Sequence, residues 1–221
     1  MGRRALRKID PHLDYGPWLR TVDQLPQPCS TAAVFGREAP LEVELGSGKG
    51  LFLATAAAAN PQRNFLGVEV AQRYARYTAA RLAGQRLANA AVVHGDGLRL
   101  FREFLPAAGL AAVHVYFPDP WWKARHRKRR VLNAPFLADV VRVLEDGGRL
   151  HFWTDVQEYY DSTLELIAAE TPLSGPQGVP PRVAEHDLDF RTHFERRTRL
   201  AGEAVYRAEF VKRGGVAAST S

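Results

Sequence analysis

The sequence contains one cysteine, Cys29, among 221 residues, and it has no long apolar run. A single cysteine excludes both a disulfide framework and a zinc site built on cysteines, so we expect a reducing compartment such as the cytoplasm. No apolar stretch is long enough to span a membrane, and none follows the basic start MGRRALRKID, so neither a membrane anchor nor a signal peptide is expected. The histidines show no spacing typical of metal ligands, and we expect no metal.

The chain carries a net positive charge. Lysine and arginine number 30 against 24 acidic residues, and the formal net charge is +6. A basic surface favours polyanionic partners, and arginine, which is far commoner here than lysine, adds bidentate phosphate contacts and stacking on bases. The length and the hydrophobic content of 46% are typical of one globular domain with a substantial core.

Composition divides the chain into three parts. Residues 1–35 contain several arginines and a proline-rich stretch, LPQPCS, and we expect a basic N-terminal arm that is mobile or loosely docked. Residues 36–213 are expected to form the functional domain. The last segment, 214–221, reads GVAASTS after its first glycine and is expected to be a flexible tail.

From Leu41 the sequence alternates short apolar runs with longer segments of helical periodicity. The predicted strands cover 41–45, 64–70, 90–96, 111–117 and 148–154. The predicted helices cover 51–59, 72–88, 98–105, 133–144, with Asn133 as N-cap, and 156–170. This order predicts an α/β fold with a doubly wound, mostly parallel sheet. Residues 203–213 alternate like an antiparallel strand, and 171–181 are expected to form a loop.

A glycine-rich loop follows the first predicted strand. Its glycines, Gly46, Gly48 and Gly50, have the spacing G-x-G-x-G, which differs from the dinucleotide fingerprint and from the P-loop. By itself this loop predicts a tight strand–helix turn as readily as a ligand site.

Three acidic residues lie where successive predicted strands end: Glu44, Glu69 and Asp96. Ligands of open α/β sheets bind at this edge, and acids there would repel a pyrophosphate but attract a cationic ligand. S-adenosylmethionine fits, since Glu44 could bind its amino group, Glu69 its ribose hydroxyls and Asp96 its adenine amine. Each acid alone could be a solvated strand end; together with the glycines they predict a cofactor site.

The fourth predicted strand runs into Pro118-Asp119-Pro120-Trp121, and six of the eight residues from Lys123 to Arg130 are lysine or arginine. The prolines restrict the backbone and aim the Asp119 carboxylate. A fixed acid and an aromatic side chain beside a cationic run suit a planar base attached to a polyanion. Alone, the run could be a solvated face, and Trp121 could equally pack in the core.

These stretches resemble the bacterial tRNA (guanine-N7-)-methyltransferases, which are class I S-adenosylmethionine-dependent enzymes with a Rossmann-like fold. The resemblance covers roughly residues 41–213. It is carried by VELGSGKG, GVE, HGD, FPDPWWKARHRKRR, the TD at 154–155, RTHFERR and EFVKR. The long block around PDPW is the most specific of them.

The resemblance implies roles for individual residues. Those implied for the cofactor S-adenosylmethionine are Glu44, Gly46, Gly48, Glu69, Asp96 and Asp119, with Asp119 also catalytic. Those implied for the substrate are Lys123, Asp155, Thr192, His193, Phe194 and Glu195. The expected RNA phosphate contacts are Arg125, Arg127, Lys128, Arg129 and Arg130. Pattern alone gives simpler roles to some of them: Thr192 to Glu195 matches a helix capping box, and Asp155 could cap the helix that follows it.

The expected function is methyl transfer from S-adenosylmethionine to N7 of a guanine in tRNA, in the variable loop. N7 carries a free lone pair and needs no deprotonation. One alternative is an exocyclic-amine methyltransferase, because PDPW resembles the Asn/Asp-Pro-Pro-aromatic loop of that class; here only one proline follows the acid. The other is an RNA-binding relative that has lost catalysis, which the intact acids and glycines disfavour.

Overall fold

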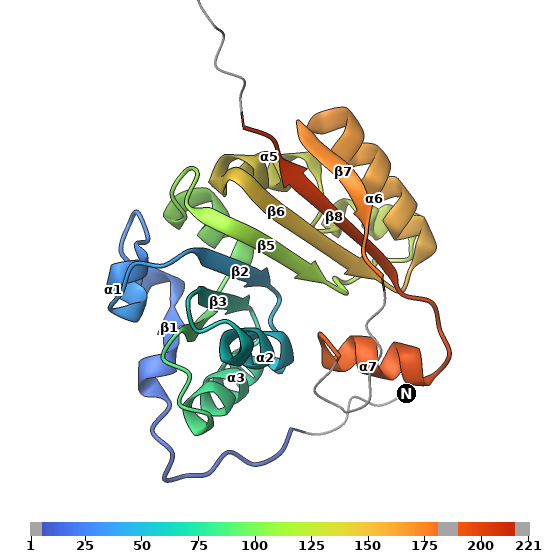
Figure 1. Ribbon diagram of the computed structural model, residues 1–221. Helices are drawn as coiled ribbons and strands as arrows, with labels where there is room; N and C mark the ends of the chain where they lie inside the picture. The colour runs from blue at the N-terminus through green and yellow to red at the C-terminus, as the bar shows by residue number, and fades with distance from the viewer. Residues whose placement is uncertain (1–5, 181–189, 215–221) are drawn as a thin grey trace, which may run out of the picture.

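Eight strands form one sheet in the computed structural model, which describes residues 6–180 and 190–214 (Figure 1). The spatial order is β1-β4-β3-β2-β5-β6-β8-β7, and β8 alone runs antiparallel, between β6 and β7. The strands are β1 Leu19–Thr21, β2 Leu41–Leu45, β3 Asn64–Glu69, β4 Ala90–His94, β5 Leu110–Tyr116, β6 Leu144–Thr154, β7 Leu173–Gly178 and β8 Tyr206–Lys212. The predicted fold class, with its antiparallel C-terminal strand, is confirmed.

Helices cover both faces of the sheet (Figure 1). On one face lie α2 Leu51–Ala59, α3 Gln72–Gly84 and α7 His193–Leu200. On the other lie α1 Thr31–Phe35, α4 Gly97–Arg99 with the π-helix Leu100–Phe104, α5 Ala134–Val143 and α6 Gln157–Glu170. Within the described ranges, no helix has the length and apolar character needed to cross a membrane.

The helix predictions are confirmed apart from their ends. The Asn133 side chain caps α5 as expected, accepting the Phe136 N–H at 3.1 Å. Helix α3 ends at Gly84 instead of residue 88, because the chain turns at Arg86, whose φ is +53°. The predicted helix at 98–105 is a short α-helical turn that continues as a π-helix.

The expected loop at 171–181 is wrong, because this segment contains strand β7 at the edge of the sheet. Pro176 lies inside it, where the pairing with β8 shifts register between Ser174 and Gln177. A proline cannot donate a ladder hydrogen bond and is tolerated at edges and bulges, so the sequence pattern was that of a loop.

The expected loose arm is docked over much of its length. Strand β1 pairs with β4, and Val22, Leu25, Cys29 and Val34 are buried in the core. Apolar side chains every few residues hold the segment against the sheet, which its prolines and charges obscured in the sequence. Residues 1–5 and 215–221 lie outside the described ranges, and the division into arm, domain and tail stays a prediction.

Candidate active site at the carboxyl edge of the sheet

The glycine-rich loop between β2 and α2 exposes backbone atoms that no side chain covers. Gly46 and Gly48 have φ angles of +79° and +54°, a region that side chains disfavour. The N–H groups of Gly46 and Ser47 both donate to the Val68 carbonyl, which holds the loop over the end of β3. Apart from Gly46 and its two neighbours, no described residue has an atom within 4 Å of where a Cβ of Gly46 would be, so bare backbone faces open space. A ligand can approach this loop closely.

Glu69 is buried at the end of β3 and is fixed by backbone donors. One carboxylate oxygen accepts the Gly48 N–H at 2.9 Å, and the other accepts the Ala71 N–H at 2.8 Å. Each oxygen keeps a lone pair for a further donor, such as a ribose hydroxyl. Val70 beside it is 74% exposed and offers an apolar surface to a flat ring. Val70 was not among the predicted site residues, although its place directly after a strand-end acid was a signal.

Glu44 is only 2% exposed, and its Oε2 atom has no hydrogen-bond partner among the described residues. Burial and the nearby Glu69 charge raise the pKa of Glu44 well above its usual value, while Arg191 opposes this rise. A buried carboxylate without a partner is costly, and a cationic ligand group would satisfy it.

This raised pKa predicts that cofactor affinity depends on pH. Below the raised pKa Glu44 is protonated and cannot attract an ammonium group, so affinity should fall as the pH drops through that value. The fall should approach tenfold per pH unit, the limit for one linked proton. Calorimetric titration with S-adenosylhomocysteine between about pH 5 and 8 would measure it. The Glu44→Gln variant, as control, should bind weakly with a flat profile; a flat wild-type profile would contradict the role of Glu44.

Asp96 and Asp119 are both exposed at the same edge. Asp96 caps α4 through Oδ1, which accepts the Leu98 N–H at 2.9 Å, so Oδ2 is the atom left for a ligand amine. Asp119 lies between Phe117 and Trp121, whose φ angles are +50° and +47°. Such angles are rare for bulky residues and persist only where the surroundings impose them. The Phe117 N–H donates to the Trp153 carbonyl at 2.8 Å and ties this loop to β6.

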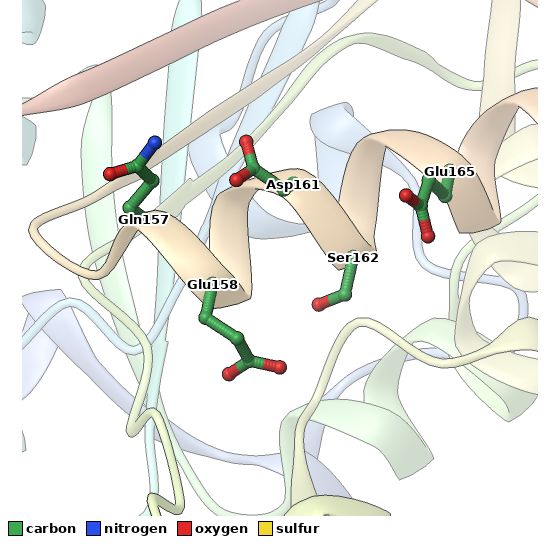
Figure 2. A pocket seen from close by; sticks show the side chains of 5 residues that line it. All are labelled: Gln157, Glu158, Asp161, Ser162 and Glu165. Atoms are coloured by element: carbon green, nitrogen blue, oxygen red, sulfur yellow. The ribbon is translucent and has the colours of Figure 1, made fainter.

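Arg130 does not match its expected role as a phosphate contact, because it is 7% exposed and its guanidinium is used within the protein. Its Nε donates to the Pro120 carbonyl at 2.9 Å, and its terminal nitrogens reach Glu158 at 2.5 and 3.2 Å and Ser162 at 3.3 Å. Figure 2 shows Glu158 and Ser162 projecting from the same side of α6. The guanidinium also lies over the Tyr159 ring. Arg130 therefore braces the loop that carries Asp119.

The rest of the cationic run forms a short 3-10 helix, Ala124–Arg129, whose basic side chains are largely exposed. Arg129 lies over the Trp121 ring at 5.0 Å, so Trp121 packs against this run, whereas Trp122 is 69% exposed. Arg127 lies 3.4 Å from Glu158. The hollow along α6 in Figure 2 is lined by acids, which disfavours a polyanion there.

The segment before α7 follows the capping pattern. Thr192 Oγ1 accepts the Glu195 N–H at 3.0 Å, while a Glu195 oxygen accepts the Arg191 N–H at 2.7 Å. Glu195 is 3% exposed and pairs with Arg207 at 2.9 Å. Its carboxylate therefore has a structural role and is closed to a substrate, in contrast to the substrate contact that we expected. Thr192 is half-buried, whereas His193 and Phe194 are exposed.

Asp155 and Phe194 are two further predicted substrate contacts at this edge. Asp155 does not cap α6, because Val156 occupies the N-cap position without a side-chain bond. Phe194 stacks on Phe117 with ring centroids 5.0 Å apart, which brings the start of α7 to the end of β5.

Within the described ranges, no group of three or more His, Cys, Asp or Glu side chains could hold a metal ion.

The face of the sheet beside Glu44 carries a polar network that the sequence analysis did not identify. His114 Nε2 lies 2.8 Å from Glu42, and His114 Nδ1 lies 2.9 Å from the Tyr116 hydroxyl. Burial lowers the pKa of His114 and favours the neutral ring; because a carboxylate can only accept, Nε2–H is the donor to Glu42, which leaves Nδ1 to accept from the Tyr116 hydroxyl. His151 stacks on His114 from the next strand. These contacts place a hydrogen-bonded polar network on the face of the sheet that α2 covers.

Comparisons with known proteins agree with this geometry. A family described as "Putative methyltransferase" matches residues 38–208. A tRNA (guanine-N(7)-)-methyltransferase of Rhodopirellula baltica is 49% identical over 219 residues, which cover 96% of this chain and 81% of the relative. One of Paraburkholderia xenovorans is 36% identical, with coverage of 96% and 78%.

Solved structures show the same fold at low sequence identity. The 16S rRNA methyltransferase KamB matches with a TM-score of 0.62 and 17% identity, covering 88% of this chain and 99% of that one. A SAM-dependent O-methyltransferase of Thermotoga maritima matches with a TM-score of 0.53 and 16% identity, covering 80% and 61%. At this identity the likeness supports the fold alone.

Proposed function

The chain belongs to the tRNA (guanine-N(7)-)-methyltransferase family, and we propose that it transfers a methyl group from S-adenosylmethionine to N7 of a guanine in tRNA. The observation that carries the proposal is the acid-lined carboxyl edge of β2, β3 and β4 beside the Asp119 loop and its cationic run. We further propose that the guanine lies in the variable loop and that the enzyme works in the cytoplasm, where tRNA is found.

The residues present fit S-adenosylmethionine. The unpartnered Oε2 of Glu44 suits its ammonium group, the fixed carboxylate of Glu69 suits the ribose, and the bare loop at Gly46 and Gly48 leaves room for the ligand. Asp96 Oδ2 would accept from the adenine amine. When bound, this cofactor supplies a methyl group activated by a sulfonium.

Asp119 would orient the guanine instead of removing a proton. The N7 atom of guanine has no proton, so the requirement is alignment of its lone pair with the methyl group. The Asp119 carboxylate would accept hydrogen bonds from the imino and amino groups of the base and stabilise the positive charge that develops on the ring. Lys123, Asp155, Thr192, His193 and Phe194 stay proposed substrate contacts.

The exposed cations of the run would bind RNA phosphates. We include Arg125, Arg127, Lys128 and Arg129 and leave out Arg130, whose guanidinium is occupied. The double variant Arg125→Gln/Lys128→Gln should weaken tRNA binding and reduce the slope of log K against log salt by about one unit per lost phosphate contact. Arg102→Gln, which removes an exposed cation held only at 3.8 Å from Asp139, is the control. Unchanged slopes for the double variant would contradict this surface.

The deciding experiment for the function uses bulk unmodified tRNA, the purified protein and cofactor labelled in its methyl group. We expect labelled 7-methylguanosine, mapped to the variable loop by sequencing. A methyl group on an exocyclic amine would instead indicate an exocyclic-amine methyltransferase. Binding of both cofactor and tRNA without transfer would support an inactive RNA-binding relative.

A further inference from the structure

Arg191 directly precedes the α7 N-cap Thr192, and its guanidinium lies close to two aromatic side chains. Its Cζ atom is 5.5 Å from the Phe52 ring centroid and 5.8 Å from that of Trp153. Its Nε is buried and has no hydrogen-bond partner among the described residues. Contacts with rings involve the faces of a guanidinium and make no hydrogen bond to its N–H groups, so the buried Nε–H of Arg191 still needs an acceptor.

Arg191 and Glu44 lie on the same face of the sheet. Glu44 pairs in register with His114, and the Phe52 ring lies 4.5 Å from the His114 ring. Arg191, in contact with Phe52, is thus close to Glu44, and their charges interact. Both side chains keep a buried polar atom without a partner, Nε in one and Oε2 in the other. The indole Nε1 of Trp153 is a third such atom and a second unpartnered donor.

We propose that Arg191 binds the carboxylate of the cofactor's methionyl group, while Glu44 binds its ammonium group. An amino acid carries these two charges on one carbon, so its site needs a cation and an anion close together beside the glycine loop. The Phe52 and Trp153 rings beside the guanidinium restrict its orientation, and a guanidinium fork can bind a carboxylate bidentately. The unpartnered N–H of Trp153 adds a second donor for the same group.

This site concerns the cofactor alone, so it stands or falls independently of which base is methylated. Its test compares two probes, S-adenosylhomocysteine and the analogue that lacks only the carboxylate, S-adenosyl-3-thiopropylamine. Affinities of the intact protein are measured by calorimetry. The wild type should bind the parent ligand about 10- to 100-fold more tightly than the analogue, the range for one charge-assisted hydrogen bond. Arg191→Gln should lose this preference, weakening the parent ligand and leaving the analogue nearly unchanged.

Arg197→Gln is the matched control, since it removes an exposed arginine from the helix that follows Arg191 and should keep the preference. Thermal unfolding checks that each variant is folded. If Arg191→Gln does not fold, the wild-type comparison still decides, together with Arg191→Lys, which keeps the charge and should retain part of the preference. Equal wild-type affinity for the two ligands, or an equal loss of both in Arg191→Gln, would overturn the assignment.

Discussion

Asp119→Asn is expected to slow methyl transfer by about 10²- to 10³-fold, the scale for one preorganised electrostatic contact. The amide keeps the shape of the side chain but removes the charge and turns one acceptor into a donor. The side chain is exposed at the tip of a loop, so the fold should be retained. Single-turnover rates with saturating tRNA and cofactor would measure the chemical step.

The pH dependence of the wild type separates positioning from proton abstraction. Because N7 has no proton to lose, the rate should fall only at low pH, where the carboxylate is protonated. Asp161→Asn, which changes an exposed acid on α6, is the control and should act like the wild type. Near-normal transfer by Asp119→Asn would refute this role, as would a rate that climbs through the pKa of the guanine imino proton.

The central strands could be predicted from the sequence because each is buried on both faces and is therefore a short apolar run. Strands β2, β3 and β5 are buried over most of their length. Strands β1 and β7 could not be predicted from the sequence, because β1 has only three residues and β7 contains two glycines and a proline. Both owe their extended shape to the strand beside them.

The position of Glu44, Glu69 and Asp96 at one edge of the sheet could be predicted by a general rule, since the ends of parallel strands meet there. The roles of Arg130 and Arg191 depend on contacts that no local pattern contains. Arg130 is indistinguishable in sequence from Arg129, yet Arg130 bonds to Glu158, 28 residues away, whereas Arg129 lies over the Trp121 ring. Arg191 looks like a surface arginine until α7 brings it onto Phe52.

Arg130→Gln is expected to impair catalysis without changing how tRNA binding depends on salt. Arg130 Nε donates to the carbonyl of Pro120, the residue directly after Asp119, and the same guanidinium pairs with Glu158. Glutamine is too short to make both contacts, so the loop loses its brace. The free energy of unfolding should drop by about 1–3 kcal/mol, as for lost hydrogen bonds to a charged group. Transfer should slow by about 10²-fold, since an error of about 1 Å in position can cost that much.

Three measurements distinguish a brace from a phosphate contact. Urea unfolding gives the stability, single-turnover kinetics give the chemical step, and tRNA binding at several salt concentrations gives the slope, which should equal that of the wild type. Glu158→Gln should have a smaller effect on transfer than Arg130→Gln, because Arg130 would keep its bonds to Pro120 and Ser162. Arg125→Gln/Lys128→Gln should show the opposite result, with normal stability and a reduced slope. If Arg130→Gln instead keeps its stability and loses one unit of slope, Arg130 contacts phosphate, and the Asp119 loop is held by the φ-restricted prolines and the Phe117 bond to β6.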